Sequence, residues 1–209
     1  MNILSSLLLL MPDVAFRRAA TKHLATSALK ADGARVWQKT SSLQAKLRKT
    51  QPRYSLGLNL FLRYMEWDHA LYRAMQEHGM PPEQAHQLIE EINWEIFGSG
   101  IGASFALSRL RSARLQTRVQ WILGWLFFAL FTKPFRKQAV PSDNGIAFDV
   151  VRCPVAEYFQ QQGLPELTRY AACNLDHRMA RNWGVKLERS QTLAEGGTLC
   201  DFRFKMMQK

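Results

Sequence analysis

The sequence predicts an α+β fold in which a mainly helical N-terminal two thirds, residues 1–140, packs on a small antiparallel β-sheet with two helices, residues 145–209. Apolar residues recur at helical spacing in the first region, whereas apolar and polar residues alternate in parts of the second. The loop sequence from Pro141 to Gly145 separates the two regions. With 209 residues, of which 47% are hydrophobic, the chain can bury a sizeable core, so we expect one integrated domain.

Five helices are predicted in the first region, preceded by a short apolar docking helix in Met1–Met11. They cover approximately residues 14–30, 33–50, 54–79, 83–97 and 121–131. Asp13 is the expected N-cap of the first of the five. No basic residue precedes the Met1–Met11 run and no cleavage site follows it, so a secretory signal is not expected. Gly98–Gly102 follows a helix and lacks the spacing of a phosphate loop, which predicts a helix break there.

Trp121–Phe131 contains eleven residues without a charge and lies between basic clusters. Eleven residues cannot cross a bilayer, which requires about 20 apolar residues. The segment is therefore either a buried core helix, which we favour, or a cationic helix that makes a peripheral contact with a membrane surface.

The second region begins with a strand, Ile146–Arg152, with Ile146, Phe148 and Val150 on one face. Pro154 favours a first helical position, which places Cys153 at the N-cap of a helix over Val155–Gln162. A sulfur there meets free backbone N–H groups and the positive end of the helix dipole. We therefore expect a lowered pKa for the Cys153 thiol.

The next predicted helix, about Glu166 to Trp183, has two contrasting sides. Its apolar ridge consists of Leu167, Ala171, Leu175 and Met179, and its other side carries Arg169, Cys173, Asp176 and His177. A cysteine would normally join the ridge. Cys173 therefore either lines a cleft or is a partly exposed cysteine without a function.

Val185–Leu193 alternates as a strand and directs Arg189 towards the apolar side. A buried arginine needs a carboxylate. This carboxylate belongs either to a ligand or to Glu157, Glu166 or Asp176 in a structural ion pair. The Ala194–Gly197 segment predicts a hairpin turn, after which Cys200 faces the core with Phe202, Phe204 and Met206.

The composition describes a basic protein, with 28 Lys and Arg against 17 Asp and Glu and a net charge of +11. We interpret most of this charge as a solvated surface, so nucleic acid is not expected as a partner, whereas a small-molecule carboxylate is. Three cysteines form no disulfide framework, which predicts a reducing, cytoplasmic location. Zinc held by the cysteines and His177, or a metal at the pairs Glu66/His69 and Glu83/His86, is a geometric alternative. We expect neither a metal nor a cofactor.

Several motifs of the last third resemble those of the L-2-amino-thiazoline-4-carboxylic acid hydrolase family. They are Phe148-x4-Cys153-Pro154-x2-Glu157-Tyr158-Phe159, Gly163-x-Pro165-Glu166-Leu167, Cys173-x2-Asp176 and Arg189-x2-Thr192-Leu193-Ala194-x-Gly196-x3-Cys200-Asp201-Phe202. The first two thirds resemble the family loosely, through Ala70-Leu71-Tyr72-x2-Met75-x2-His78-Gly79. The resemblance implies an α+β fold and hydrolysis of the C–N bonds of a cyclic amidine, such as 2-amino-thiazoline-4-carboxylate, in cysteine metabolism.

The resemblance and the residue types together assign roles to eight side chains. We expect four catalytic residues, Cys153, Cys173, Asp176 and His177, and four substrate-binding residues, Arg189, Thr192, Glu157 and Cys200. Cys173 or Cys153 is the candidate nucleophile, unless water attacks directly. The alternative function is a non-catalytic protein of the same fold that binds a small molecule or senses redox state.

Overall fold

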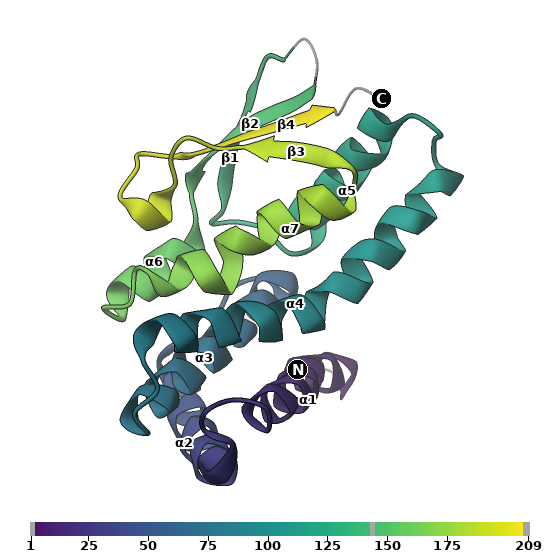
Figure 1. Ribbon diagram of the computed structural model, residues 1–209. Helices are drawn as coiled ribbons and strands as arrows, with labels where there is room; N and C mark the ends of the chain where they lie inside the picture. Colours follow the sequence, from purple (N-terminus) through teal and green to yellow (C-terminus); the bar gives the residue numbers. More distant parts are fainter. Residues whose placement is uncertain (1–2, 143–144, 207–209) are drawn as a thin grey trace. The chain divides into compact units, whose positions relative to one another are not determined.

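The computed structural model describes residues 3–142 and 145–206, and the chain forms two compact units that meet in sequence between Ile96 and Phe97 (Figure 1). These residues contain seven α-helices and a four-stranded antiparallel sheet, which confirms the predicted α+β class. Asp143 and Asn144 of the predicted loop lie outside the described residues.

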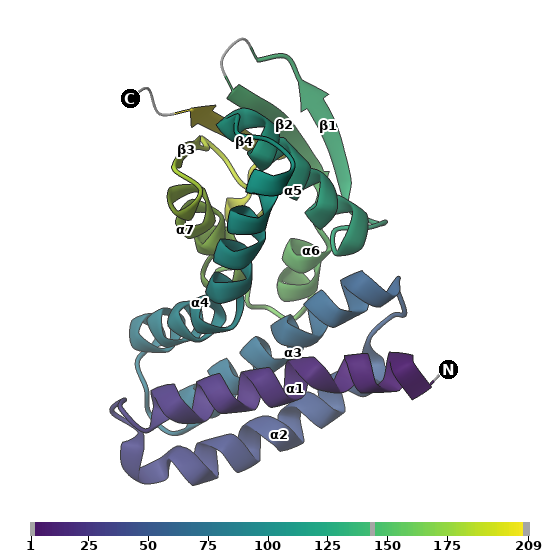
Figure 2. The same cartoon turned by 90° about the vertical axis from the view of Figure 1, so that its right-hand side faces the viewer.

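The first unit is helical and is organised around its third helix. It contains α1 (Ile3–Leu24), α2 (Gly33–Thr50), α3 (Leu56–Glu77) and the first part of α4 (Pro82–Leu107), which continues into the second unit. Both α1 and α2 pack against α3 (Figure 2). All residues from Met65 to Tyr72 are buried, so this part of α3 is enclosed around its whole circumference. Polar side chains on it must therefore find partners inside the protein.

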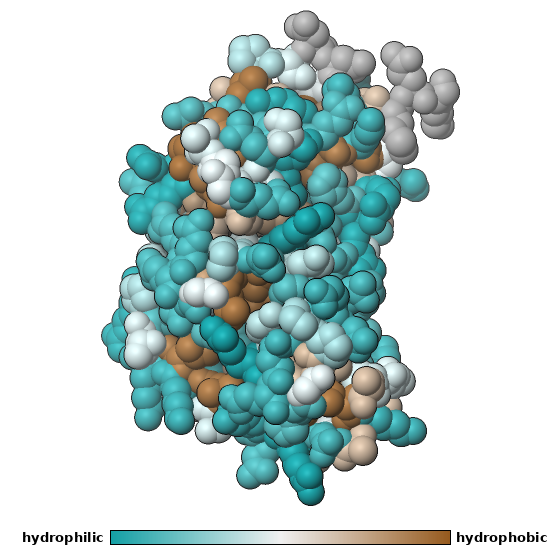
Figure 3. Space-filling view, turned by 60° about the vertical axis from the view of Figure 1, so that its left-hand side comes forward, coloured by the Kyte–Doolittle hydropathy of each residue, from teal (hydrophilic) through white to brown (hydrophobic). Residues whose placement is uncertain are grey.

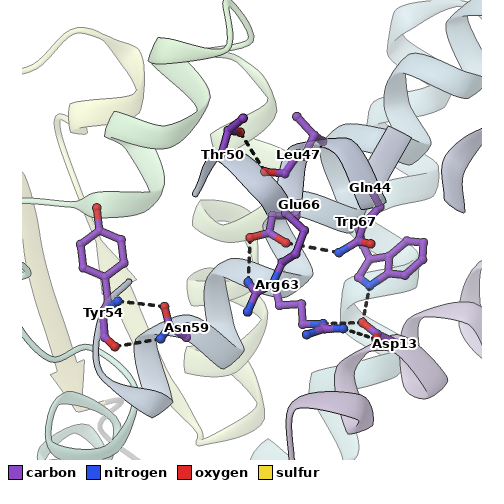
Figure 4. A network of polar contacts seen from close by, with 10 residues as sticks. Asp13, Gln44, Leu47, Thr50, Tyr54, Asn59, Arg63, Glu66 and Trp67 are labelled. Atoms are coloured by element: carbon purple, nitrogen blue, oxygen red, sulfur yellow. Dashed lines mark hydrogen bonds and ion pairs between the residues drawn. The ribbon is translucent and has the colours of Figure 1, made fainter. Parts of the chain in front are cut away.

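A polar network joins α3 to its two neighbours (Figure 4). Arg63 donates two hydrogen bonds to the carboxylate of Asp13 on α1, and Trp67 Nε1 donates to the same carboxylate at 2.8 Å. On the other side, Arg48 Nη1 of α2 donates to Glu66 Oε1 at 3.0 Å. Asp13 thus lies inside α1, and its predicted role as an N-cap is wrong, because its carboxylate pairs with α3 and α1 begins at Ile3.

The second unit holds the sheet. After the end of α4 it contains α5 (Leu115–Ala129), β1 (Arg136–Val140), β2 (Gly145–Arg152), α6 (Pro154–Gln161), α7 (Asn174–Asn182), β3 (Val185–Glu188) and β4 (Cys200–Met206). The strand order is β1-β2-β4-β3, and every neighbouring pair is antiparallel. The edge strand β1 was not predicted, because it is polar and mostly exposed and shows no apolar alternation.

One face of the sheet is covered by α5 and α7 (Figure 1). The buried core of the unit consists of Val119, Ile122 and Leu123 of α5, Met179, Ala180 and Trp183 at α7, and Phe148, Val150, Val185, Leu187, Cys200 and Phe204 of the sheet. In the β2–β4 register, Phe148 lies opposite Phe202 and Val150 opposite Cys200. The predicted faces of these two strands are therefore confirmed.

Two predicted boundaries are wrong. Residues 98–102 continue α4 despite their three glycines, and Gly102 faces the side chain of Asn182, 3.7 Å from where its Cβ would lie. The strand predicted over Val185–Leu193 ends at Glu188, because the chain leaves the sheet at Arg189. Long-range packing overrides the local pattern at both places.

The surface is largely hydrophilic on the face shown in Figure 3, with smaller apolar areas between polar side chains. Of the helices formed by residues 3–142 and 145–206, none is both long enough and apolar enough to cross a membrane.

Candidate functional site

The helical segment that carries Cys173 contains a wide turn. Residues Arg169–Cys173 form a π-helical turn that leads directly into α7. The ridge predicted on this segment is confirmed, since Leu167, Ala171, Leu175 and Met179 are all buried. Residues spaced by four do not stay on one face of an α-helix, which has 3.6 residues per turn. The π-turn has more residues per turn, so it keeps these four side chains closer to one face. Single π-turns occur frequently at functional sites.

Arg189 is the centre of the candidate site. Its side chain is only 6% exposed, and its Nη1 donates to Asp176 Oδ2 at 2.9 Å. Its Nη2 donates to the carbonyl oxygen of Cys173 at 3.2 Å, and the guanidinium lies 5.2 Å from the ring centroid of Phe202. The protein itself thus supplies a carboxylate to the buried arginine. The end of β3, the start of α7, the π-turn and β4 all contribute to the group.

Asp176 is held in an environment that favours its neutral form. Burial raises the pKa of this carboxyl from 3.8 to about 6, although Arg189 acts in the opposite direction. Its side chain remains 27% exposed, so it is accessible from one side. A carboxyl that titrates near neutral pH can both accept and return a proton under ordinary conditions.

The three thiols are all protonated at neutral pH. Burial raises the pKa of Cys153 to about 12, and it raises the pKa of Cys173 and of Cys200 as well. Cys153 does occupy the N-cap of α6, as predicted. The predicted lowering of its pKa is nevertheless wrong, because the loss of hydration outweighs the nearby N–H groups of Ala156 and Val155. Electrostatic interactions with Cys200 contribute to the raised pKa of Cys153 and of Cys173, so the three sulfurs lie in one region.

The segment after Arg189 is a tight turn that closes on β4. Thr192 is buried and caps the short helix Leu193–Glu195, accepting from Glu195 N at 3.1 Å and donating to its Oε2 at 2.9 Å. Gly196 has a φ of +84°, as the predicted turn requires. The backbone N–H of Leu193 donates to Cys200 Sγ at 3.3 Å. Thr192 and Cys200 thus hold the turn together.

Of the two remaining predicted residues, His177 lies beside this group, whereas Glu157 pairs with a residue outside it. His177 follows Asp176 and is half-buried, and burial, followed by Arg189, Arg181 and Arg169, lowers its pKa, so its imidazole is neutral at pH 7. Glu157 accepts two hydrogen bonds from Arg152, at 2.7 and 3.1 Å. Both of its oxygens are thus already engaged with a neighbouring side chain.

Asp201 is a site residue that the periodicity did not indicate. Its carboxylate accepts hydrogen bonds from Ser190 N and Gln191 N, both at 2.9 Å, and from Ser190 Oγ at 2.7 Å. Although burial acts in the opposite direction, these donors lower the pKa of Asp201. It therefore fixes the backbone immediately after Arg189. Its place between Cys200 and Phe202 in the motif was the available signal.

Within the described parts of the chain, no group of three or more His, Cys, Asp or Glu side chains has the arrangement of a metal site. The zinc and Glu-x-x-His alternatives thus find no support in the geometry. Glu66, for example, is engaged by Arg48 and Gln44.

Two comparisons with known proteins bear on this group. A model of the family described as L-2-amino-thiazoline-4-carboxylic acid hydrolase matches residues 59–204. The matched range contains Cys173, Asp176 and Arg189. A search of curated proteins found no match.

Proposed function

The chain belongs to the L-2-amino-thiazoline-4-carboxylic acid hydrolase family, and from this premise we propose that it is a hydrolase that opens a cyclic amidine such as 2-amino-thiazoline-4-carboxylate. The observation that carries the proposal is the Asp176–Arg189 pair beside Cys173, which combines a titrating carboxyl with a buried cation.

The reaction needs three kinds of help from the protein. The amidine carbon resists attack because resonance delocalises electrons onto it, so a nucleophile, a group that stabilises the amidinium and a proton donor for the departing ring atom are all required. Water adds to the amidine carbon, the bond from that carbon to a ring heteroatom breaks, and the water oxygen becomes the new carbonyl oxygen. The two protons of the water end on the ring nitrogen and the sulfur if the carbon–sulfur bond breaks, or both on the ring nitrogen if the carbon–nitrogen bond breaks. The product is a ring-opened carbamoyl-cysteine.

Water is the nucleophile that the thiol environments favour. A thiolate is the reactive form of cysteine, and burial raises the pKa of Cys153 and Cys173 far above neutral pH. In the proposal, Asp176 accepts a proton from the attacking water, since its pKa of about 6 leaves it mostly ionised at pH 7. Cys173 donates its thiol proton to the departing ring atom, and the proton taken up by Asp176 then returns to the Cys173 sulfur.

Arg189 has two roles in the proposal. A guanidinium has five N–H donors. Arg189 uses one on Asp176 and one on the Cys173 carbonyl, which orients the base. In the proposal, one of its remaining donors binds the carboxylate of the substrate. The neutral imidazole of His177 relays protons to solvent, while Thr192, Glu157 and Cys200 shape the surrounding turn and helix.

The second candidate function is a non-catalytic protein that binds a small molecule or senses redox state. The gathering of three thiols in one region favours it. Redox-sensing cysteines, however, are usually thiolates of low pKa. The raised pKa of all three thiols therefore favours the hydrolase.

The test is mass-spectrometric detection of carbamoyl-cysteine formed from 2-amino-thiazoline-4-carboxylate by the purified protein. Removal of a general base costs about 10²- to 10⁴-fold in rate, so Asp176→Asn should lose most turnover. Arg189→Ala should raise KM and lower kcat together. Glu188→Gln, a change of a half-buried acid of β3 that pairs with Lys186 and Lys205, is the matched control and should keep wild-type turnover.

Two outcomes would contradict the proposal. If the wild-type protein did not turn over 2-amino-thiazoline-4-carboxylate at neutral pH, this compound would not be its substrate. If Asp176→Asn turned over the substrate as fast as the wild type, Asp176 would not be the general base. Cys173 or Cys153 would then again be the candidate nucleophile.

A further inference from the structure

The outer face of α5 carries large aromatic side chains that the core does not use. Val119, Ile122 and Leu123 face inwards and are buried. On the outer face, Trp125 is 52% exposed and Phe128 is 77% exposed. The sequence predicted either a buried core helix or a helix at a membrane surface. One face of α5 is indeed part of the core, and the opposite face is exposed to solvent.

The exposed rings of Trp125 and Phe128 form a continuous surface with the half-buried ring of Trp121, which also packs against the core, and we call these three residues the aromatic ridge. The ring centroids of Trp121 and Trp125 are 6.4 Å apart, and those of Trp125 and Phe128 are 5.8 Å apart. Within the second unit, α5 lies in front of the sheet in the view of Figure 2. Contiguous exposed aromatic surface of this kind marks an interaction site more often than isolated exposed residues do.

A cationic pocket of about 460 Å³ lies beside the C-terminal end of α5. The basic pocket, as we call it, is lined by Phe127, Phe131, Phe135, Lys133, Arg136 and Lys137, with Thr132, Gln138 and Val151. No acidic residue lines it. From Phe97 to Ser142 the sequence has seven Lys and Arg residues and no Asp or Glu.

The basic side chains of this pocket are available to an anion. Lys133 and Arg136 are exposed, and neither has a carboxylate partner among the residues described by the structure. Lys137 Nζ lies 4.1 Å from the ring centroid of Phe127, a cation–π contact that leaves its outer side open to solvent. The lining of the pocket therefore combines three cationic side chains with three phenylalanine rings.

The two features together select one kind of partner. We propose that the aromatic ridge and the basic pocket dock the chain on an anionic membrane surface, with the ridge at the boundary between headgroups and acyl chains. Aromatic rings favour this boundary, and Lys and Arg beside them attract anionic headgroups. The basic pocket holds a lipid phosphate, while α5, with 15 residues, lies in the plane of the surface.

Other partners fit the same surface less well. A second copy of the chain would bring one cationic pocket against another and would be opposed by like charges. Single-stranded nucleic acid needs flat rings on which bases stack, whereas Trp121, Trp125 and Phe128 meet at interplanar angles of 67° and 90°.

The experiment is flotation of the full-length protein with two kinds of vesicle, pure phosphatidylcholine and equal parts phosphatidylcholine and phosphatidylserine. We expect binding to the anionic vesicles at low salt, release at high salt, and little binding to the neutral ones. Trp125→Ala/Phe128→Ala should weaken binding by about tenfold or more through lost apolar burial. Lys133→Gln/Arg136→Gln should weaken it by about 25-fold, since each cation contributes about fivefold.

Matched double variants separate the surface from general effects of charge and hydrophobicity. Leu107→Ala/Leu110→Ala removes exposed apolar side chains from the same unit, and Lys46→Gln/Lys49→Gln removes two exposed cations from α2. Both should bind like the wild type. The proposal is overturned if the wild type does not bind anionic vesicles at low salt. It is likewise overturned if the ridge variant, Trp125→Ala/Phe128→Ala, binds as well as Leu107→Ala/Leu110→Ala. It is also overturned if the ridge variant only dissociates an oligomer in sizing chromatography.

Discussion

The environment of Asp176 makes a quantitative prediction about stability and pH. Asp176→Asn keeps the shape of the side chain and an oxygen that can accept from Arg189, but it removes the titrating group. Burial raises the pKa of Asp176 from 3.8 to about 6 even with Arg189 Nη1 at 2.9 Å. The folded protein therefore binds this proton more tightly than the unfolded chain. The stability from this group is fully present below pH 3.8 and is lost as the pH rises through about 6.

The size of this loss follows from the two pKa values. Each tenfold difference in proton affinity corresponds to about 1.4 kcal/mol, so a change from 3.8 to about 6 amounts to about 3 kcal/mol. The side chain is 27% exposed, and screening by water lowers the expected value towards about 2 kcal/mol. As the pH rises from acid to neutral, the wild type should lose this much free energy of unfolding, whereas Asp176→Asn should not.

The assay is urea unfolding of both proteins at a series of pH values between about 4 and about 8. Weakening the contact with Arg189 could also lower the free energy of unfolding of the variant by the same amount at every pH. The readout is therefore how the difference in free energy of unfolding between the variant and the wild type changes with pH. Glu188→Gln is the control and should give no gain, because hydrogen bonds from Lys205 and then Lys186 lower the pKa of Glu188. Parallel curves for the wild type and Asp176→Asn would refute the reasoning.

Three further predictions concern titrating and nucleophilic groups. The value of kcat/KM on the cyclic amidine should fall as the pH drops below about 6, because protonation of Asp176 removes the proposed base, and a profile that is flat down to about pH 4 would contradict this. Asp68 is fully buried and its pKa is raised well above 3.8 by burial, so its contribution to stability is lost as the pH rises through the folded pKa. Asp68→Asn should therefore be more stable than the wild type at alkaline pH in urea unfolding, and an equal loss of stability in both proteins would argue against it. Iodoacetamide should alkylate the native thiols at pH 7 more slowly than free cysteine, as followed by intact mass, and modification of Cys173 at the rate of free cysteine would contradict its raised pKa.

The local pattern of the chain was sufficient for much of the second unit. Alternation along β2 and β4 identified the faces that carry Phe148, Val150 and Cys200, because successive side chains of a strand point to opposite sides. Arg189 was also predicted to be buried, and its side chain is buried, although the chain has already left the sheet at this residue. The motifs around these residues indicated the family that the comparison then confirmed.

The proton affinities of the site residues could not be obtained from the sequence. The N-cap position of Cys153 was correctly predicted, yet its pKa is raised, since burial depends on everything packed around the sulfur. Likewise, Asp176 was one of three candidate carboxylates for Arg189. Only the turn of the chain out of β3 brings these two side chains together.

By itself, the sequence determined which side of each element is apolar, because that property repeats with the period of a strand or a helix. The tertiary structure decided which groups meet and how much water each one keeps. It placed the Arg169–Cys173 turn beside Arg189, and it left Trp125 and Phe128 open while burying Ile122 and Leu123 on the same helix. Periodicity is local, whereas burial and charge pairing arise from residues far apart in the chain.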